Sequence, residues 1–99
     1  PIDADWTSEL ADADLVKILV GQLGKVPEPA LVAALGGVLA RPDVTDDIRL
    51  DAVRGLGKLQ DPGALRALGD YVAQTPKQPV RVSRQEAELM VGARAGGGQ

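Results

Sequence analysis

The fold is decided by residues 46–75, which read DDIRLDAVRGLGKLQDPGALRALGDYVAQT. Apolar residues in the first half recur at the spacing of one face of an α-helix: Ile48, Ala52, Val53, Leu56 and Leu59. A second stripe follows after a corner at residues 60–62, and it consists of Ala64, Leu65, Leu68 and Val72, with Tyr71 at its edge. Because neither helix can bury its stripe alone, the two are expected to pack on each other and on neighbours.

The ends of these two helices are marked by residues that cap helices. Thr45 is predicted to be the N-cap of the first helix, and Asp46 and Asp47 place negative charge on its first turn. Asp61 is predicted to cap the second helix, with Pro62 at the first helical position, where its missing N–H does no harm. The stretch is therefore a predicted helical hairpin.

The same pattern occurs a second time, 33 residues earlier. Residues 14–41 aligned with 47–74 give ten identities in 28 positions, including the triplet Leu-Gly-Lys and the corner proline. The identical pairs are Asp14/Asp47, Val20/Val53, Leu23/Leu56, Gly24/Gly57, Lys25/Lys58, Pro29/Pro62, Ala34/Ala67, Leu35/Leu68, Gly36/Gly69 and Ala40/Ala73. We interpret the alignment as an internal repeat.

The repeated residues resemble a HEAT-type repeat of the short bacterial form, as found in HEAT-like phycobilin lyases and scaffold proteins. The resemblance is carried by Asp47-Ile48-Arg49, Leu56-Gly57-Lys58-Leu59 and Asp61-Pro62. It implies an all-α fold, a right-handed α-α superhelix of about two and a half helical hairpins, with the second helices lining a concave face. The first copy departs from the family pattern, because Val16 stands where the family has Arg and Pro27 falls in the corner.

The chain then divides into an acidic N-terminal lead-in at 1–11, a repeat domain at 12–94 and a flexible tail at 95–99. Within the domain we expect repeats at 12–41 and 46–75 and a half repeat at 82–94, where Ser83 and Glu86 form a predicted capping box. Helices are expected near 12–25, 29–40, 46–59, 62–75 and 83–94. The first is expected to turn Leu15, Ile18, Leu19, Leu23 and Val26 to one side. The predicted most buried residues are Leu19, Leu23, Leu35, Val53, Leu56, Leu68 and Met90.

Glycine recurs in the middle of both second helices, at Gly36 and Gly69. A glycine there costs about 1 kcal/mol relative to alanine. We expect that close helix crossing offsets this cost.

The composition argues against a catalytic site. Histidine and cysteine are absent, which removes the usual general base, the thiol nucleophile and most zinc ligands. The only carboxylate cluster, Asp43, Asp46, Asp47 and Asp51, is interpreted as helix N-terminal and surface charge, since its spacing is not that of a calcium loop. We expect no enzyme activity, no metal and no cofactor.

Nucleic acid and membrane are not the expected partners. The net charge is −3, and basic residues alternate with acids and form no continuous stripe. No apolar run reaches the roughly 18 residues of a membrane span. The compartment is left open, with the cytoplasm favoured over export because no signal sequence is visible.

The predicted function is therefore a non-catalytic protein–protein interaction or scaffold module, part of a larger or processed protein, with a partner whose identity the sequence does not give. Its protein-binding face is expected on the outward side of the second helices. On the 33-residue alignment these positions are Ala33/Arg66, Gly37/Asp70 and Arg41/Gln74. The alternative for Arg66 and Asp70 is an ordinary surface pair four residues apart.

Two further alternatives concern ligands and assembly. Family resemblance implies a lyase- or chaperone-like domain that binds a prosthetic group such as a bilin. Residues 1–14 carry five acids and no base, and residues 77–99 carry a net charge of +2, so weak head-to-tail self-association is conceivable. The favoured alternative is that the lead-in, anchored by Trp6, covers one end and the half repeat covers the other.

Overall fold

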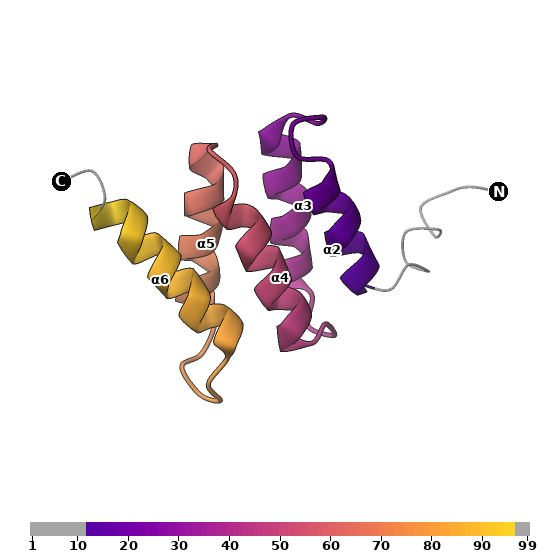
Figure 1. Cartoon of the computed structure of the whole chain (residues 1–99). Coiled ribbons are helices and arrows are strands. Elements are labelled where there is room, and N and C mark those ends of the chain that lie inside the picture. Colours follow the sequence, from indigo (N-terminus) through magenta and orange to yellow (C-terminus); the bar gives the residue numbers. More distant parts are fainter. Residues whose placement is uncertain (1–11, 97–99) are drawn as a thin grey trace.

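The computed structural model describes residues 12–96, and this part of the chain is all-α, as predicted. Its helices are α2 (Asp12–Gly21), α3 (Glu28–Ala40), α4 (Asp46–Gly57), α5 (Pro62–Gln74) and α6 (Val82–Gly96) (Figure 1). Among residues 12–96 there is no strand, only an isolated bridge between Leu23 and Val26. The predicted lead-in at 1–11, with Trp6, and residues 97–99 of the predicted tail lie outside the described residues.

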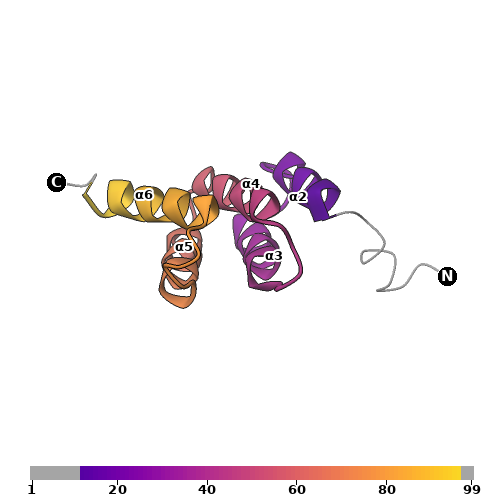
Figure 2. The same cartoon turned by 90° about the horizontal axis from the view of Figure 1, so that it is seen from below.

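The helices form two layers. The first layer contains α2, α4 and α6, in which α4 contacts both of the others. The second layer contains α3 and α5, which contact each other beneath α4 in the view of Figure 2. Each helix also contacts the next one along the chain. None of the described helices covers the second layer on the side that faces away from α4.

The central hairpin begins as the sequence predicts and ends within two residues of the expected positions. Thr45 Oγ1 accepts a hydrogen bond from the backbone N–H of Ile48 at 3.4 Å, and Asp61 Oδ2 accepts one from Gly63 at 2.8 Å. Pro62 occupies the first turn of α5. Both N-cap predictions are confirmed, and they fix the corner between α4 and α5.

The first helix is shorter than predicted, because α2 ends at Gly21 and not near residue 25. The chain turns at residues 22–26, where the backbone oxygen of Gln22 accepts hydrogen bonds from the N–H groups of Lys25 and Val26. Gly24 has φ +84°, a left-handed conformation that favours glycine. Leu23 is consequently 41% exposed, so its prediction as a core residue is wrong.

The core lies where the two layers meet. Four predicted core residues, Leu35, Val53, Leu56 and Leu68, are at most 1% exposed, whereas Leu19 and Met90 pack only partly buried against them. Ile18, also expected on the inward face of the first helix, is 46% exposed. The core is completed by residues that include Val16, Leu31, Leu59, Ala64 and Ala87. Aliphatic side chains thus supply almost all of it, with Tyr71 as the only aromatic member of the described core.

The capping box predicted for α6 is wrong. The helix begins at Val82, so Ser83 lies inside it, fully buried. Ser83 Oγ lies 2.5 Å from Asp46 Oδ1 and 2.5 Å from the hydroxyl oxygen of Tyr71, and the Ser83 N–H donates to Asp46 Oδ2 at 3.2 Å. The serine therefore joins α6 to α4 and α5. The helix also continues to Gly96, two residues into the expected tail.

Close helix crossing does not explain Gly36 and Gly69. A Cβ atom added to either glycine would meet nothing within 4 Å. Close approaches occur instead at Gly55, where an added Cβ would lie 3.0 Å from Val20 and 3.2 Å from Leu35, and at Gly57, where it would lie 2.7 Å from Met90. The packing explanation is therefore wrong for the two repeated glycines, and Gly36 faces a hollow in the surface.

Candidate binding groove between the second helices

Two adjoining hollows lie along the line where α3 and α5 meet. They share Leu39, Ala40, Tyr71 and Gln74, so they form one continuous groove on the second layer. We call the hollow of about 220 Å³ the apolar hollow and the one of about 360 Å³ the arginine hollow. Concave surface with an apolar floor and a few polar groups is the usual form of a binding site.

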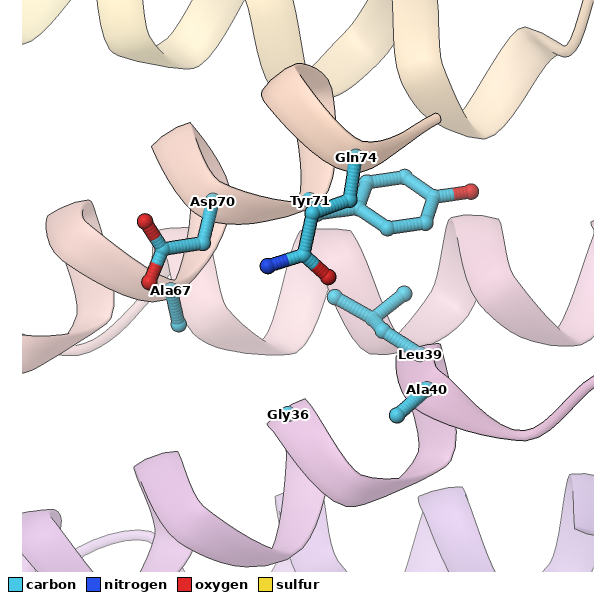
Figure 3. A pocket seen from close by; sticks show the side chains of 7 residues that line it. All are labelled: Gly36, Leu39, Ala40, Ala67, Asp70, Tyr71 and Gln74. Carbon is cyan, nitrogen blue, oxygen red and sulfur yellow. The ribbon is translucent and has the colours of Figure 1, made fainter. Parts of the chain in front are cut away.

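The apolar hollow has small side chains on both walls. Gly36 and Ala40 come from α3 and Ala67 from α5, while Leu39 and Tyr71 face each other across the gap (Figure 3). Asp70 and Gln74 supply the polar groups at its edge. The missing side chain at Gly36 leaves this space open, which is a role in shape that the repeat pattern alone does not reveal.

The side chain of Tyr71 is fixed by a buried hydrogen bond to α6. Its ring lines both hollows, and its hydroxyl group is hydrogen-bonded to buried Ser83 of α6. The side chain is only 7% exposed. A buried aromatic ring whose polar tip is satisfied gives the groove a rigid wall.

The arginine hollow lies at the end of the groove where α3 and α5 finish. Its charged lining residues are three arginines: Arg41 after α3, Arg49 in the first turn of α4, and Arg81 before α6. Pro42, Thr75 and Pro76 form the rest of the rim. None of the described residues that line this hollow is acidic.

Arg49 is the most unusual of the three because it is only 7% exposed. Its Nη2 donates to the carbonyl oxygens of Arg41 at 3.1 Å and Pro42 at 3.4 Å. These two residues directly follow α3. The Nε of Arg49 is buried and finds no acceptor among the described residues. The guanidinium group is therefore fixed by backbone contacts, with one donor unsatisfied.

The predicted site residues fall on this face, but only half of them line the groove. Asp70 and Gln74 border the apolar hollow, and Arg41 and Gln74 border the arginine hollow. Ala33, Gly37 and Arg66 are exposed and line neither hollow. Within the described residues no ion pair joins Arg66 to Asp70, so the surface pair considered as an alternative is not formed.

The lining residues that sequence reasoning missed include Arg49, Tyr71 and Arg81. Arg49 was recognised only as part of the repeat pattern, and Tyr71 only as the edge of an apolar stripe. The residue types themselves could have indicated a binding site, since arginine and tyrosine are enriched at binding hot spots. No periodic sequence pattern includes Arg81, because the loop between α5 and α6 sets its position.

The described surface has further hollows, and one of about 350 Å³ is lined by residues that include Lys77, Arg81 and Glu88. A hollow of about 330 Å³ between α2 and α4 is lined by residues that include Val16, Val20, Asp51 and Arg54. In the part of the chain that the structure describes, no cluster of three acidic residues could hold a metal ion, and Asp46 is engaged with Ser83. None of α2–α6 has the length and apolar character that a membrane-spanning helix requires.

Comparisons with family models, with curated proteins and with solved structures find no match to this chain.

Proposed function

We propose that this chain is a protein–protein interaction or scaffold module, built from HEAT-like repeats in a right-handed superhelix, and that it binds its partner in the groove between α3 and α5. The observation that carries the proposal is the continuity of the two hollows, which share a wall of four residues along both second helices. An extended or helical peptide segment has the shape to lie along such a groove.

Contacts between successive hairpins support the repeat. Glu28 at the first corner accepts hydrogen bonds from the backbone N–H groups of Gln60 at 2.8 Å and Asp61 at 2.7 Å in the second corner. The two corners, which the 33-residue alignment pairs, are thus joined directly. Each contact lies between neighbouring units, as in repeat proteins whose stability comes from nearest-neighbour interfaces.

An arginine contact also recurs. Arg49 near the start of α4 donates to the carbonyl of Pro42, which follows α3, and Arg84 near the start of α6 donates through Nε to the carbonyl of Thr75 at 3.0 Å, which follows α5. Pro42 and Thr75 are 33 residues apart, one position beyond the aligned range, whereas Arg49 and Arg84 are 35 residues apart. The corresponding position of the first copy is Val16, which is buried and has no such role.

The test is a photo-crosslinking experiment from defined positions. A benzophenone amino acid is placed at Ala40 or Ala67, which line the groove, and at Arg54 on the opposite layer as a matched control. We expect partner crosslinks from the first two positions only, and their loss when Gly36→Leu fills the apolar hollow. Equal crosslinking from Arg54 would contradict a groove on the second layer.

No feature of the described structure specifically supports the bilin alternative. It rests on family resemblance, and likeness of fold does not carry function. Absorbance after incubation with a tetrapyrrole and removal of the free pigment separates the two possibilities. We expect the protein to remain colourless, and a retained absorption band would favour the prosthetic-group alternative.

A further inference from the structure

We propose that the arginine hollow binds a carboxylate group of an acidic peptide segment in the partner protein. This inference rests on the proposed function and names the partner's chemistry. It is carried by the three arginines around one hollow and by the buried, unsatisfied donor of Arg49.

The charge at this end of the groove is positive and concentrated. Arg41, Arg49 and Arg81 line a hollow of about 360 Å³, and among the described residues an ion pair joins Arg41 to the mostly exposed Asp43 at 3.7 Å. No hydrogen bond or ion pair of the Arg81 guanidinium group is found within residues 12–96. Helix ends do not cancel this charge, because α3 and α5 finish beside the hollow while α4 and α6 begin there.

Arg49 supplies the second, independent observation. Its side chain is 93% buried, and burial of a charged group is unfavourable unless its donors are satisfied. Nη2 is satisfied by two carbonyl oxygens, but Nε is not satisfied by any described residue. Unsatisfied buried donors are rare in proteins, and one beside a hollow with two more arginines points to an anionic ligand.

The form of the site favours a peptide carboxylate over a nucleic acid. Arginine binds carboxylates and phosphates alike. A nucleic acid, however, presents a phosphate at every nucleotide and needs a continuous basic track. Here the arginine hollow continues into the apolar hollow, where Asp70 is the only charged residue among the described lining residues. A peptide carboxylate in the arginine hollow, with uncharged side chains of the same segment over the apolar hollow, therefore fits the groove, and a row of phosphates does not.

The experiment uses the full chain on an array of short peptides made in matched pairs. Each acidic peptide has a twin in which every Asp and Glu is replaced by Asn and Gln. We expect acidic members to bind about tenfold more strongly than their twins at low salt, as for one charge-assisted contact. Arg81→Gln should remove this preference, whereas Arg54→Gln, an exposed arginine of the opposite layer, should leave it unchanged.

A second readout reports on Arg49 without mutating it, since loss of its backbone contacts could unfold the chain. The best-binding acidic peptide and its amide twin are resynthesised and titrated into ¹⁵N-labelled protein. The Nε–H resonance of Arg49 should shift with the acidic peptide only. Circular dichroism of Arg81→Gln and Arg54→Gln checks that both variants keep the helical fold.

Three outcomes overturn the inference. Equal binding of acidic peptides and amide twins would retain the groove and reject the carboxylate. Displacement of the acidic peptide by a single-stranded oligonucleotide at lower concentration than by free peptide would assign the hollow to phosphate. Binding of no peptide at all would reject the acidic partner, while the crosslinking pattern from Ala40 and Ala67 would still decide the proposed function separately.

Discussion

At the scale of single residues, glycine has two different roles in this chain. Gly69 lies within α5, and a Cβ atom there would meet nothing within 4 Å, whereas Gly55 of α4 is packed against Val20 and Leu35. We expect Gly69→Ala to raise the free energy of unfolding by about 1 kcal/mol through helix propensity. Gly55→Ala is the matched control and should be less stable than Gly69→Ala in urea melts. The reverse order would show that the packing around Gly55 is looser than the structure indicates.

Ser83 provides a second prediction at this scale. Its hydroxyl group joins Tyr71 and Asp46, and the side chain is fully buried. Ser83→Ala leaves both partners without this contact, so we expect a loss of about 1–3 kcal/mol in unfolding free energy. Tyr71→Phe should lose less, because Ser83 then still donates to Asp46. Denaturant melts of the two variants measure the difference, and a neutral Ser83→Ala would mean that water replaces the network.

The N-caps were predictable from sequence because an N-cap side chain bonds to a backbone N–H group no more than three residues away. Thr45 and Asp61 bond to the backbone at Ile48 and Gly63, so their roles depend on local spacing alone. Ser83 followed by Glu86 has the same spacing, but its partner is Asp46, 37 residues away. Local pattern therefore gave the wrong role, since the tertiary contact determined it.

At the scale of elements, the stripe on α4 is the part of the fold that sequence predicts best. Leu56 is fully buried at the centre of the two layers. Leu56→Ala should therefore lower the free energy of unfolding by about 2–5 kcal/mol. Leu89→Ala on α6 is the control, since Leu89 is 69% exposed and should change stability by less than about 0.5 kcal/mol. A loss below about 1 kcal/mol for Leu56→Ala in denaturant melts would contradict the assignment of the core.

The exposed side of α5 carries the next prediction. Arg66 and Asp70 are exposed and make no ion pair with each other in the described structure, so reversing both charges should leave helicity unchanged. We expect Arg66→Glu with Asp70→Arg to weaken partner recovery in a pull-down, because Asp70 borders the groove. Circular dichroism is the control for folding. Undiminished recovery would place the binding face elsewhere, on the layer of α2, α4 and α6.

The first hairpin shows where periodicity fails. Leu23 and Val26 continue the apolar spacing of α2, yet the helix ends at Gly21 because Gly24 allows a left-handed turn. In the second copy the equivalent Gly57 remains helical. Identical residues at equivalent positions thus adopt different conformations, and an aligned pair of glycines cannot indicate which one ends a helix. Arg41, Asp70 and Gln74 of the predicted binding face line the groove, but its arginine end depends on loops that have no periodicity.

At the scale of the whole molecule, two of the four basic residues near the C-terminal end make contacts within the chain. The basic excess of residues 77–99 comes partly from Arg84 and Arg94. Arg84 pairs with Glu88 and donates to Thr75, and Arg94 Nη2 donates to the carbonyl oxygens of Gly57 and Leu59, both at 2.8 Å. These contacts hold two of the four basic side chains within the chain, and they leave the net charge of +2 unchanged.

We expect a monomer in sedimentation experiments at protein concentrations up to about 1 mM, at both about 50 mM and about 500 mM salt. Salt shortens the range of electrostatic attraction, so stacking of an acidic end on a basic end would give a mass that rises at low salt and falls at high salt. That result would contradict the expectation. A mass that rises equally at both salt levels would point instead to Val82 and Leu89, which are 55% and 69% exposed seven residues apart on α6. Leu89→Lys should then restore the monomer, because a charge in the centre of an apolar contact opposes its burial.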